Sequence, residues 1–304
     1  MSDSFAPHAV TLRQLQYVVA VADLGGFGRA AAVCHVSQPS LSAQVALAEQ
    51  QLRVQVFERS RRGMRVSAAG GVVLERARAV LAAARQLEDA AVQLTDPFSG
   101  TLRLGVIPTV GPYLLPDLVP IIRGAYPRLT VQWTEERTPT LVRMVNDGQL
   151  DAAVVALDAG LEHLEHRRLS FDPFVIAAAK GNPVATNPRP ARLKDLDGQE
   201  VLLLEDGHCL RDQALSLCDA AGARESTFRA TSLGTLVQMV GAGSSVTVLP
   251  LMAVPVENRR GQLAVRAFAS KDSGRTLVLA WRKGSALREA LAAIATALQK
   301  GLPS

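Results

Sequence analysis

The chain has 304 residues, of which 48% are hydrophobic and 20% charged, and its net charge is +5. This length favours two domains, and the apolar content is enough for ordinary cores, which excludes a disordered chain. No apolar run reaches about 18 residues, so we expect no membrane span. No basic stretch followed by an apolar run opens the sequence, so we expect no secretory signal.

The cysteine count argues against a secreted, disulfide-stapled protein. Three cysteines are an odd number, and without an export signal they indicate a reducing cytoplasm. There a thiol serves packing, metal binding or redox chemistry. For Cys34, on an alanine-rich helix face, a small buried hydrophobe is the favoured interpretation.

The first 66 residues predict a small helical domain. Apolar residues at helical spacing predict a helix over Leu12–Leu24, and a short alanine-rich helix follows over Phe27–Cys34. Ser37 is a suitable N-cap for a third helix. Two short helices with a tight turn between them indicate a helix-turn-helix. Val54–Phe57 and Met64–Val66 predict a two-stranded wing beside it.

Positive charge is concentrated at this wing. Five arginines and a single acid, Glu58, lie between Arg53 and Arg65. Guanidinium groups suit phosphate oxygens and narrow minor grooves, so the cluster is consistent with a nucleic-acid partner. A solvated basic loop is the alternative.

The segment Gly70–Thr95 predicts one long helix. Seven apolar residues from Val73 to Leu94 step alternately by four and three, which is the spacing of a coiled-coil seam. This favours a dimerising linker helix, while an amphipathic helix packed on its own domain stays open. Asp96–Gly100 then ends the helix.

From Thr101 onward, predicted strands alternate with helical patterns. Alternation of this kind predicts parallel sheets with helices on both faces, here divided into two lobes. The predicted strands are Leu102–Ile107, Thr130–Thr134, Asp151–Leu157, Phe174–Ala179, Val201–Leu204, Phe228–Thr231, Val246–Leu249 and Thr276–Trp281. The predicted helices are Leu141–Asp147, Arg211–Ala221, Leu233–Gly241 and Ser285–Leu302.

Short motifs connect the chain with a known family. The first 66 residues contain Leu12-Arg13-Gln14-Leu15, Phe27-Gly28-Arg29-Ala30-Ala31, Val36-Ser37-Gln38-Pro39-Ser40-Leu41-Ser42 and Val56-Phe57-Glu58-Arg59. With these spacings the segment resembles the LysR-type transcription regulators. Three later stretches resemble the peroxide-sensing members of that family: Gly105–Pro116, Leu204–Ala214 followed by Cys218, and Phe228–Leu233. The resemblance covers essentially the whole chain.

The resemblance implies an α/β chain in three parts. Residues 1–69 would form a winged helix-turn-helix and residues 70–96 a dimerising linker helix. Residues 97–304 would form a two-lobe regulatory domain like periplasmic binding proteins, with lobe I at 100–170 and 275–304 and lobe II at 171–274. The family usually has glycine at the position of Arg53, so we expect the third helix to end differently here. The segment between Cys218 and Phe228 is one residue shorter than in the peroxide sensors.

DNA contacts are expected from the third predicted helix, which is the second helix of the helix-turn-helix. The first residues of this helix enter the major groove. The candidates on that helix are Ser37, Gln38, Pro39, Ser40 and Ser42. Arg29, Arg61, Arg62 and Arg65 would bind phosphates or the minor groove. For Ser37, a helix cap alone is the alternative.

Cys209 and Cys218 do not have the spacing of a zinc site or of a Cys-x-x-Cys motif. Two unconnected packing cysteines would explain the spacing alone. However, Cys209 lies between His208 and Arg211 at a predicted helix start, where imidazole, guanidinium and helix dipole favour the reactive thiolate. If the segment is helical, the two cysteines are roughly 13 Å apart by the helical rise. A disulfide needs much closer Cα atoms, so oxidation would select a second packing.

The resemblance implies that Cys209 is the peroxidatic cysteine, oxidised to a sulfenic acid that Cys218 captures as a disulfide. It also implies that Thr109 and Thr138 hold the peroxide oxygens and that Arg275 stabilises the thiolate by charge. His208 and Asp212 would be supporting residues, with a helix cap as the smaller role for Asp212. We expect no metal and no cofactor.

These features together predict a cytoplasmic, nucleoid-associated transcription activator that senses hydrogen peroxide and is not an enzyme. It would bind double-stranded promoter DNA as a homotetramer, a dimer of dimers. It would act with RNA polymerase, and a cytosolic dithiol would reset it. One alternative keeps the DNA-binding module but replaces peroxide with a small organic effector. Another, a thiol peroxidase, would have no use for a helix-turn-helix and a dimer seam.

Overall fold

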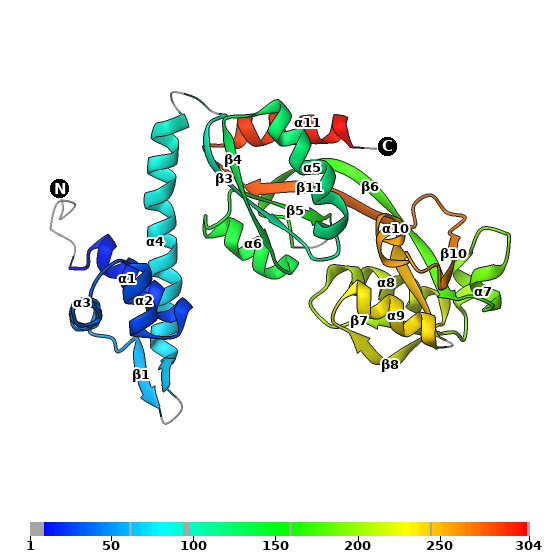
Figure 1. Cartoon of the computed structure of the whole chain (residues 1–304), viewed down its shortest axis with the longest axis horizontal. Helices are drawn as coiled ribbons and strands as arrows, with labels where there is room; N and C mark the ends of the chain where they lie inside the picture. Colours follow the sequence, from blue (N-terminus) through cyan, green and yellow to red (C-terminus); the bar gives the residue numbers. More distant parts are fainter. Residues whose placement is uncertain are drawn as a thin grey trace. The chain divides into compact units, whose positions relative to one another are not determined.

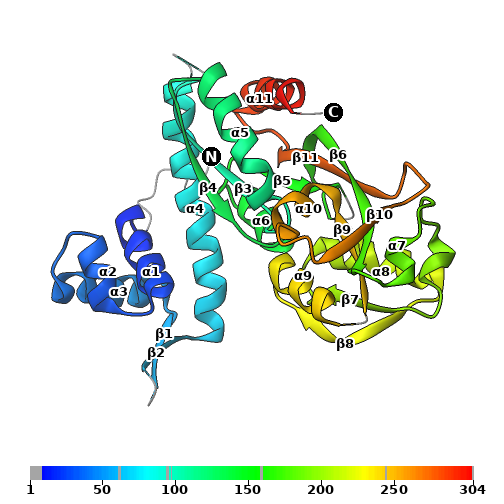
Figure 2. The same cartoon turned by 45° about the vertical axis from the view of Figure 1, so that its right-hand side comes forward.

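The computed structural model describes residues 9–60, 63–93, 96, 98–157, 160–243 and 245–302. It divides into two compact units: Met1–Ala91 with Asp147–Gln149, and Val92–Asn146 with Leu150–Ser304. Each unit is described by itself (Figures 1 and 2).

The first unit contains the predicted helix-turn-helix and wing. Its elements are α1 Leu12–Leu24, α2 Phe27–Val33, α3 Gln38–Leu52, β1 Phe57–Ser60 and β2 Gly63–Val66. The two strands pair antiparallel. Apolar residues of all three helices meet in one core that includes Val18, Ala30 and Leu41. The local sequence and this core therefore agree on the same three-helix arrangement.

The end of α3 corrects one expectation. Arg53 has φ 55° and ψ 35°, the left-handed conformation that a glycine would take at this position. Its N–H bonds the carbonyl of Gln50, and the N–H of Val54 bonds that of Glu49. The helix thus ends in the usual way although arginine replaces glycine, and the backbone strain of a left-handed L-residue is retained.

The long helix α4 spans Ala68–Gln93. It starts close against the chain before the wing, because a Cβ on Gly70 would lie 2.3 Å from the carbonyl oxygen of Val56. Leu74 is buried in the first unit's core and Val73 packs against it. Val80 and Leu87, further along the predicted seam, are 47% and 74% exposed. Only the first turns of the seam are therefore used within this unit's own core.

The second unit holds nine strands among its described residues. They are β3 Gly100–Val106, β4 Leu129–Glu135, β5 Ala152–Ala156, β6 Leu164–Ala179, β7 Glu200–Leu204, β8 Arg224–Ala230, β9 Val246–Pro250, β10 Leu263–Ala267 and β11 Gly274–Arg282. All eight predicted strands are confirmed as elements, β6 is much longer than predicted, and β10 is an addition.

Helices and short helical turns follow most of these strands. They are α5 Gly111–Ala125, α6 Thr138–Asn146, α7 Pro183–Thr186, η1 Leu193–Leu196, α8 Cys209–Ala221, α9 Leu233–Ala242, η2 Leu251–Ala253, α10 Val254–Glu257 and α11 Arg288–Gly301. The four predicted helices correspond to α6, α8, α9 and α11. Among the part of the chain that the structure describes, no helix is both long enough and apolar enough to span a membrane.

The strands form a mixed sheet in the order β4-β3-β5-β11-β6-β9-β7-β8, with β10 also paired to β6. Pairing is parallel among β3, β4 and β5 and among β7, β8 and β9. It is antiparallel wherever β6 or β11 takes part. The prediction of parallel sheets therefore holds within each lobe and is wrong for the pairs that involve β6 or β11. The reason is that β6 and β11 are long connecting strands, not members of strand–helix–strand repeats.

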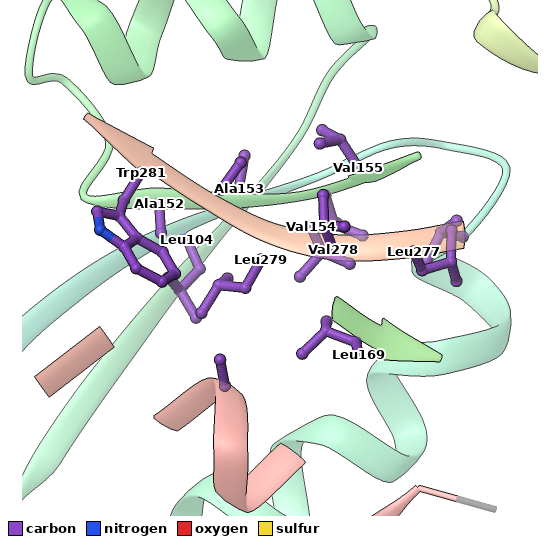
Figure 3. Packing of buried hydrophobic residues seen from close by; sticks show 14 of the residues in the cluster. Leu104, Ala152, Ala153, Val154, Val155, Leu169, Leu277, Val278, Leu279 and Trp281 are labelled. Atoms are coloured by element: carbon purple, nitrogen blue, oxygen red, sulfur yellow. The ribbon is translucent and has the colours of Figure 1, made fainter. Parts of the chain in front are cut away.

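Strand β6 divides the unit into two lobes with separate cores. Its first part pairs with β11, and its second part, from Phe174 onward, pairs with β9. We call lobe I the part formed by β3, β4, β5 and β11 with α5, α6 and α11, and lobe II the part formed by β7–β10 with α7–α10. Figures 1 and 2 show β6 running from one lobe into the other. Figure 3 shows the lobe I core, where Leu279 lies beside the Trp281 ring and Leu104.

Candidate functional site

Two threonines lie at the same edge of the lobe I sheet. Thr109 follows β3 and Thr138 begins α6 after β4, and these two strands are parallel neighbours. Carboxyl ends of adjacent parallel strands meet at one edge, which is where ligands bind in such folds. Both side chains are buried. The structure thus places the two hydroxyls expected to hold the peroxide oxygens after the carboxyl ends of neighbouring strands.

Arg275 is bonded directly to one of them. Its Nη1 donates to the Thr109 hydroxyl at 2.8 Å, and its Nη2 donates to the Thr109 carbonyl at 2.8 Å. Its Nε donates to Asp172 Oδ2 at 3.0 Å, and the two side chains are 0% and 1% exposed. Arg275 is therefore paired with a buried carboxylate and bonded to Thr109 at the same time, and its expected stabilisation of the thiolate by charge stays a prediction.

Asp172 is a site residue that the sequence did not indicate. Besides Arg275, its carboxylate accepts the N–H of Met252 at 3.1 Å, so it joins β6 to η2 of lobe II. Burial raises the pKa of Asp172, and the Arg275 charge opposes this rise. Asp172 and Arg275 are 103 residues apart in the chain. No local pattern could have paired them.

Thr138 differs from Thr109 in one respect. Its hydroxyl oxygen is buried and has no hydrogen-bond partner among the described residues. A buried polar group without a partner costs free energy, and such groups in native proteins usually have a reason. The hydroxyl is therefore available to a small polar ligand at this edge.

The two candidate thiols lie on one helix but in two different cores. Cys209 is the first residue of α8 and belongs to the hydrophobic cluster of lobe I. Cys218 is in the last turns of α8 and belongs to the cluster of lobe II. Neither is in a disulfide. Nine helical steps separate their Cα atoms by roughly 13 Å, so the predicted geometric conflict is present.

The chemical surroundings of the thiols are only partly as predicted. Cys209 begins a helix, as expected, so the positive end of the helix dipole faces it. The Arg211 guanidinium, however, bonds Glu225 and Asp206, at 2.7 and 2.8 Å. Burial, and then the charge of Arg137, lower the pKa of His208, which favours neutral imidazole. Arg211 thus has carboxylate partners of its own, and His208 favours its neutral form, while the support of the Cys209 thiolate by these groups stays a prediction.

Cys218 and Asp212 are two further residues of α8 for which a role was predicted. Burial raises the pKa of the Cys218 thiol to about 11, so it is protonated near neutral pH. Asp212 is exposed in the first turn. The N-cap of the helix is His208, and its side chain makes no capping bond. The smaller role expected for Asp212, a helix cap, is therefore wrong.

A second residue that the sequence did not indicate is Arg137, directly before Thr138. It contacts the loop Glu205–His208, which connects β7 to Cys209. This contact runs from lobe I to lobe II, and it links the threonine edge to the cysteine helix. An arginine beside a candidate ligand-binding residue was the only signal in the sequence.

The predicted DNA-contacting residues are all on the surface where the structure describes them. Ser37, Gln38, Pro39, Ser40 and Ser42 at the start of α3, and Arg29 and Arg65, are exposed. The Ser37 hydroxyl accepts the Ser40 N–H at 3.3 Å, so Ser37 is an N-cap. Arg61 and Arg62 lie outside the described residues. Cys34 is half-buried beside the core of this unit.

No group of three or more histidine, cysteine, aspartate or glutamate side chains that could hold a metal ion occurs among the residues with described placement. The site is therefore characterised by thiols, hydroxyls and an arginine–aspartate pair.

Two family models match the chain. Residues 12–71 match the bacterial regulatory helix-turn-helix protein, LysR family, and residues 95–303 match the LysR substrate binding domain. Among curated proteins, the hydrogen peroxide-inducible genes activator of Dickeya chrysanthemi is 42% identical over 280 residues, 92% of each chain. The DNA-binding transcriptional dual regulator OxyR of Escherichia coli is 40% identical over 291 residues, 95% of each chain.

Solved structures similar to this chain are also OxyR proteins. A full-length OxyR cysteine variant from Pseudomonas aeruginosa superposes with a TM-score of 0.76 and 32% identity, covering 96% of each chain. A hydrogen-peroxide-bound OxyR cysteine variant from Corynebacterium glutamicum has a TM-score of 0.65 and 33% identity, covering 98% of this chain and 94% of that one. These relatives favour peroxide over a small organic effector.

Proposed function

Because the chain belongs to the LysR family and resembles its OxyR members over more than nine-tenths of its length, we propose that it is a peroxide-sensing, DNA-binding transcription regulator. The observation that carries this proposal is the placement of Cys209 and Cys218. They lie on one helix but in the cores of two different lobes, so their chemical state controls how the lobes pack.

The reaction has two steps, with Cys209 as the peroxidatic and Cys218 as the resolving cysteine. The Cys209 thiolate attacks one oxygen of hydrogen peroxide, and the O–O bond breaks. The departing hydroxide takes up a proton and leaves as water, and Cys209 becomes a sulfenic acid. Cys218 then attacks the Cys209 sulfur, the S–O bond breaks, and a second water leaves. Two thiols are oxidised to a disulfide while one peroxide is reduced to two waters.

The threonine edge would bind the peroxide. The Thr138 hydroxyl has no protein partner among the described residues and can bond a peroxide oxygen. The Thr109 hydroxyl already accepts from Arg275, so its own hydrogen is free to point at the ligand. Asp172 holds Arg275 in this orientation. These hydrogen bonds position the O–O bond for attack. His208 and Asp212 would be supporting residues.

The disulfide requires a change of packing. Its formation removes Cys209 from the lobe I core and unwinds the first turns of α8, since both sulfurs cannot meet across an intact helix. In the chain-entropy model, a disulfide that closes a loop of this size stabilises the folded oxidised form against unfolding by about 3 kcal/mol. The helical turns that are lost offset a comparable amount, so the disulfide adds little net stability to the fold. Such a disulfide is readily reduced by cytosolic dithiols.

The output would be a change in DNA binding. The regulator would bind double-stranded promoter DNA as a homotetramer, with Val80 and Leu87 of α4 in one pairing surface, and would act with RNA polymerase. It would work in the cytoplasm, associated with the nucleoid, and would not be an enzyme in purpose. The exposed start of α3 would read bases, while Arg29, Arg61, Arg62 and Arg65 would contact phosphates.

Peptide mapping combined with DNA binding tests the proposal. The reduced full-length protein is treated with one equivalent of hydrogen peroxide, digested without reductant, and compared with the untreated protein. We expect a Cys209–Cys218 crosslinked peptide together with altered promoter binding, and neither change in Cys209→Ser. Altered DNA binding with both thiols still reduced would refute the mechanism.

A further inference from the structure

The loop before Cys209 is held from lobe I by a single arginine in the described part of the chain. The Nη1 of Arg137 donates to the Asp206 carbonyl at 3.0 Å, and its Nη2 donates to the Glu205 carboxylate. Its side chain also lies close to Gly207, where a Cβ would be 3.2 Å from Nη1. Arg137 thus contacts three consecutive residues, which end one position before His208.

The other charged contacts of this loop come from its own lobe. The Asp206 carboxylate accepts from Arg211 at 2.8 Å and from Arg229 at 3.0 Å. Arg211 is on α8 and Arg229 is on β8, so both belong to lobe II. The loop is therefore tied to lobe II through the Asp206 side chain and to lobe I through Arg137.

Oxidation would affect the contacts of Asp206 within lobe II differently from the contacts of Arg137 from lobe I. Disulfide formation takes Cys209 out of the lobe I core and toward Cys218 in lobe II. Contacts within lobe II can be kept or re-formed during this movement. The Arg137 contacts cannot be kept, because α6 stays with lobe I while the loop leaves it.

We propose that Arg137 is a positioning residue that stabilises the reduced form and thereby sets how strongly the Cys209–Cys218 pair is oxidising. The inference rests on the proposed function, since it requires the disulfide. The Arg137 side chain is 41% exposed, so the ion pair with Glu205 is partly screened. We expect this ion pair, the hydrogen bond to the Asp206 carbonyl and the contact with Gly207 together to change the thiol–disulfide equilibrium constant about tenfold.

The direction of the shift in reduction potential depends on whether Arg137 stabilises the dithiol or the disulfide form. A contact present only in the dithiol form makes the disulfide easier to reduce. Arg137→Ala should therefore shift the equilibrium about tenfold toward the disulfide, which is about 30 mV to a more negative potential. Arg137→Lys keeps the charge but loses the two-point donation, and it should shift the equilibrium by less.

The experiment equilibrates the full-length protein in buffers of reduced and oxidised glutathione. There, each disulfide reduced consumes two glutathione thiols and yields one glutathione disulfide. The fraction of the Cys209–Cys218 disulfide is measured by mass spectrometry after alkylation for Arg137→Ala, Glu205→Ala and the double variant. Arg288→Ala is the matched control, since it removes another exposed lobe I arginine with its own ion pair, to Glu165 at 2.7 Å.

We expect a shift in Arg137→Ala, a smaller shift in Glu205→Ala, and a double variant close to Arg137→Ala alone. The potential of Arg288→Ala should equal that of the unaltered protein. An unchanged potential in Arg137→Ala, or an equal shift in Arg288→Ala, would overturn the role of Arg137. A change in peroxide rate without a change in potential would also overturn it. Failure of the proposed function is seen separately, because the crosslinked peptide would then be missing from the unaltered protein.

Discussion

Replacing Thr138 by valine should make the protein more stable and less reactive. Valine keeps the shape of threonine but removes the hydroxyl, which is buried without a partner among the described residues. An unsatisfied buried hydroxyl costs about 1–3 kcal/mol. Taking the lower end, we expect Thr138→Val to raise the free energy of unfolding by about 1 kcal/mol. For a domain of this size that corresponds to a rise in Tm of about 2–4 °C.

Reactivity should change in the opposite direction. If the Thr138 hydroxyl bonds a peroxide oxygen, the variant loses one hydrogen bond of about 1 kcal/mol in the reaction complex. The rate of thiol oxidation by hydrogen peroxide should then fall about five- to tenfold. Stopped-flow measurement of thiol loss at several peroxide concentrations, alongside thermal unfolding of the reduced protein, tests both parts on one sample.

Thr109→Val is the matched comparison, because it makes the same chemical change at the neighbouring strand end. The Thr109 hydroxyl accepts from Arg275 at 2.8 Å, so its removal leaves a buried guanidinium donor unsatisfied. We expect a loss of about 1.5–3 kcal/mol of stability in addition to slower oxidation. If Thr138→Val were destabilising, or oxidised at the unaltered rate, its hydroxyl would have another role and the binding argument would be refuted.

Four further predictions follow from the geometry. Arg53→Gly relieves a left-handed backbone and should stabilise the protein by about 1 kcal/mol in thermal unfolding, whereas Arg53→Ala should give no gain. Because the pKa of His208 is lowered on folding, its contribution to stability is present above about pH 6.5 and is lost as the pH falls below it. His208→Gln should therefore flatten the stability curve in that range. Gln38→Ala should reduce discrimination between cognate and random duplexes, whereas Arg65→Ala should weaken both equally and reduce the salt dependence. Cys218→Ser should still form a sulfenic acid at Cys209, trapped by dimedone and detected by mass spectrometry, but without a crosslink it should proceed to overoxidation.

Much of the fold was accessible from local sequence. The helices of the DNA-binding unit have apolar residues at helical spacing and an N-cap at Ser37, and both are decided within a few neighbouring residues. The eight predicted strands stand where short apolar runs are bounded by turn residues. A helix start near Cys209 was also predicted, although the helical pattern itself was given as Arg211–Ala221, and with it the separation of the two thiols. Local signals sufficed here because helical hydrogen bonds join residues four positions apart and the apolar run of a strand lies within a few consecutive residues.

Long-range pairing was not accessible in the same way. The direction of β6 and β11 and the placement of β10 depend on strands far away in the chain, so the parallel prediction was wrong for the middle of the sheet. At Arg53 the residue type was also a poor guide, because the hydrogen bonds that end α3 are formed with a left-handed backbone that arginine disfavours.

For the candidate site, too, some features could be predicted from the sequence and others could not. Cys209 and Cys218 were proposed as the reactive residues from the helix start at Cys209 and from the family resemblance, since their spacing alone is equally explained by two packing cysteines. The ion pairs around them were not predicted. Asp172 pairs with Arg275 from 103 residues away, and Glu225 and Asp206 both pair with Arg211. Sequence determined which groups are present, while the tertiary structure decided which charges meet, since an ion pair depends on distance in space and not along the chain.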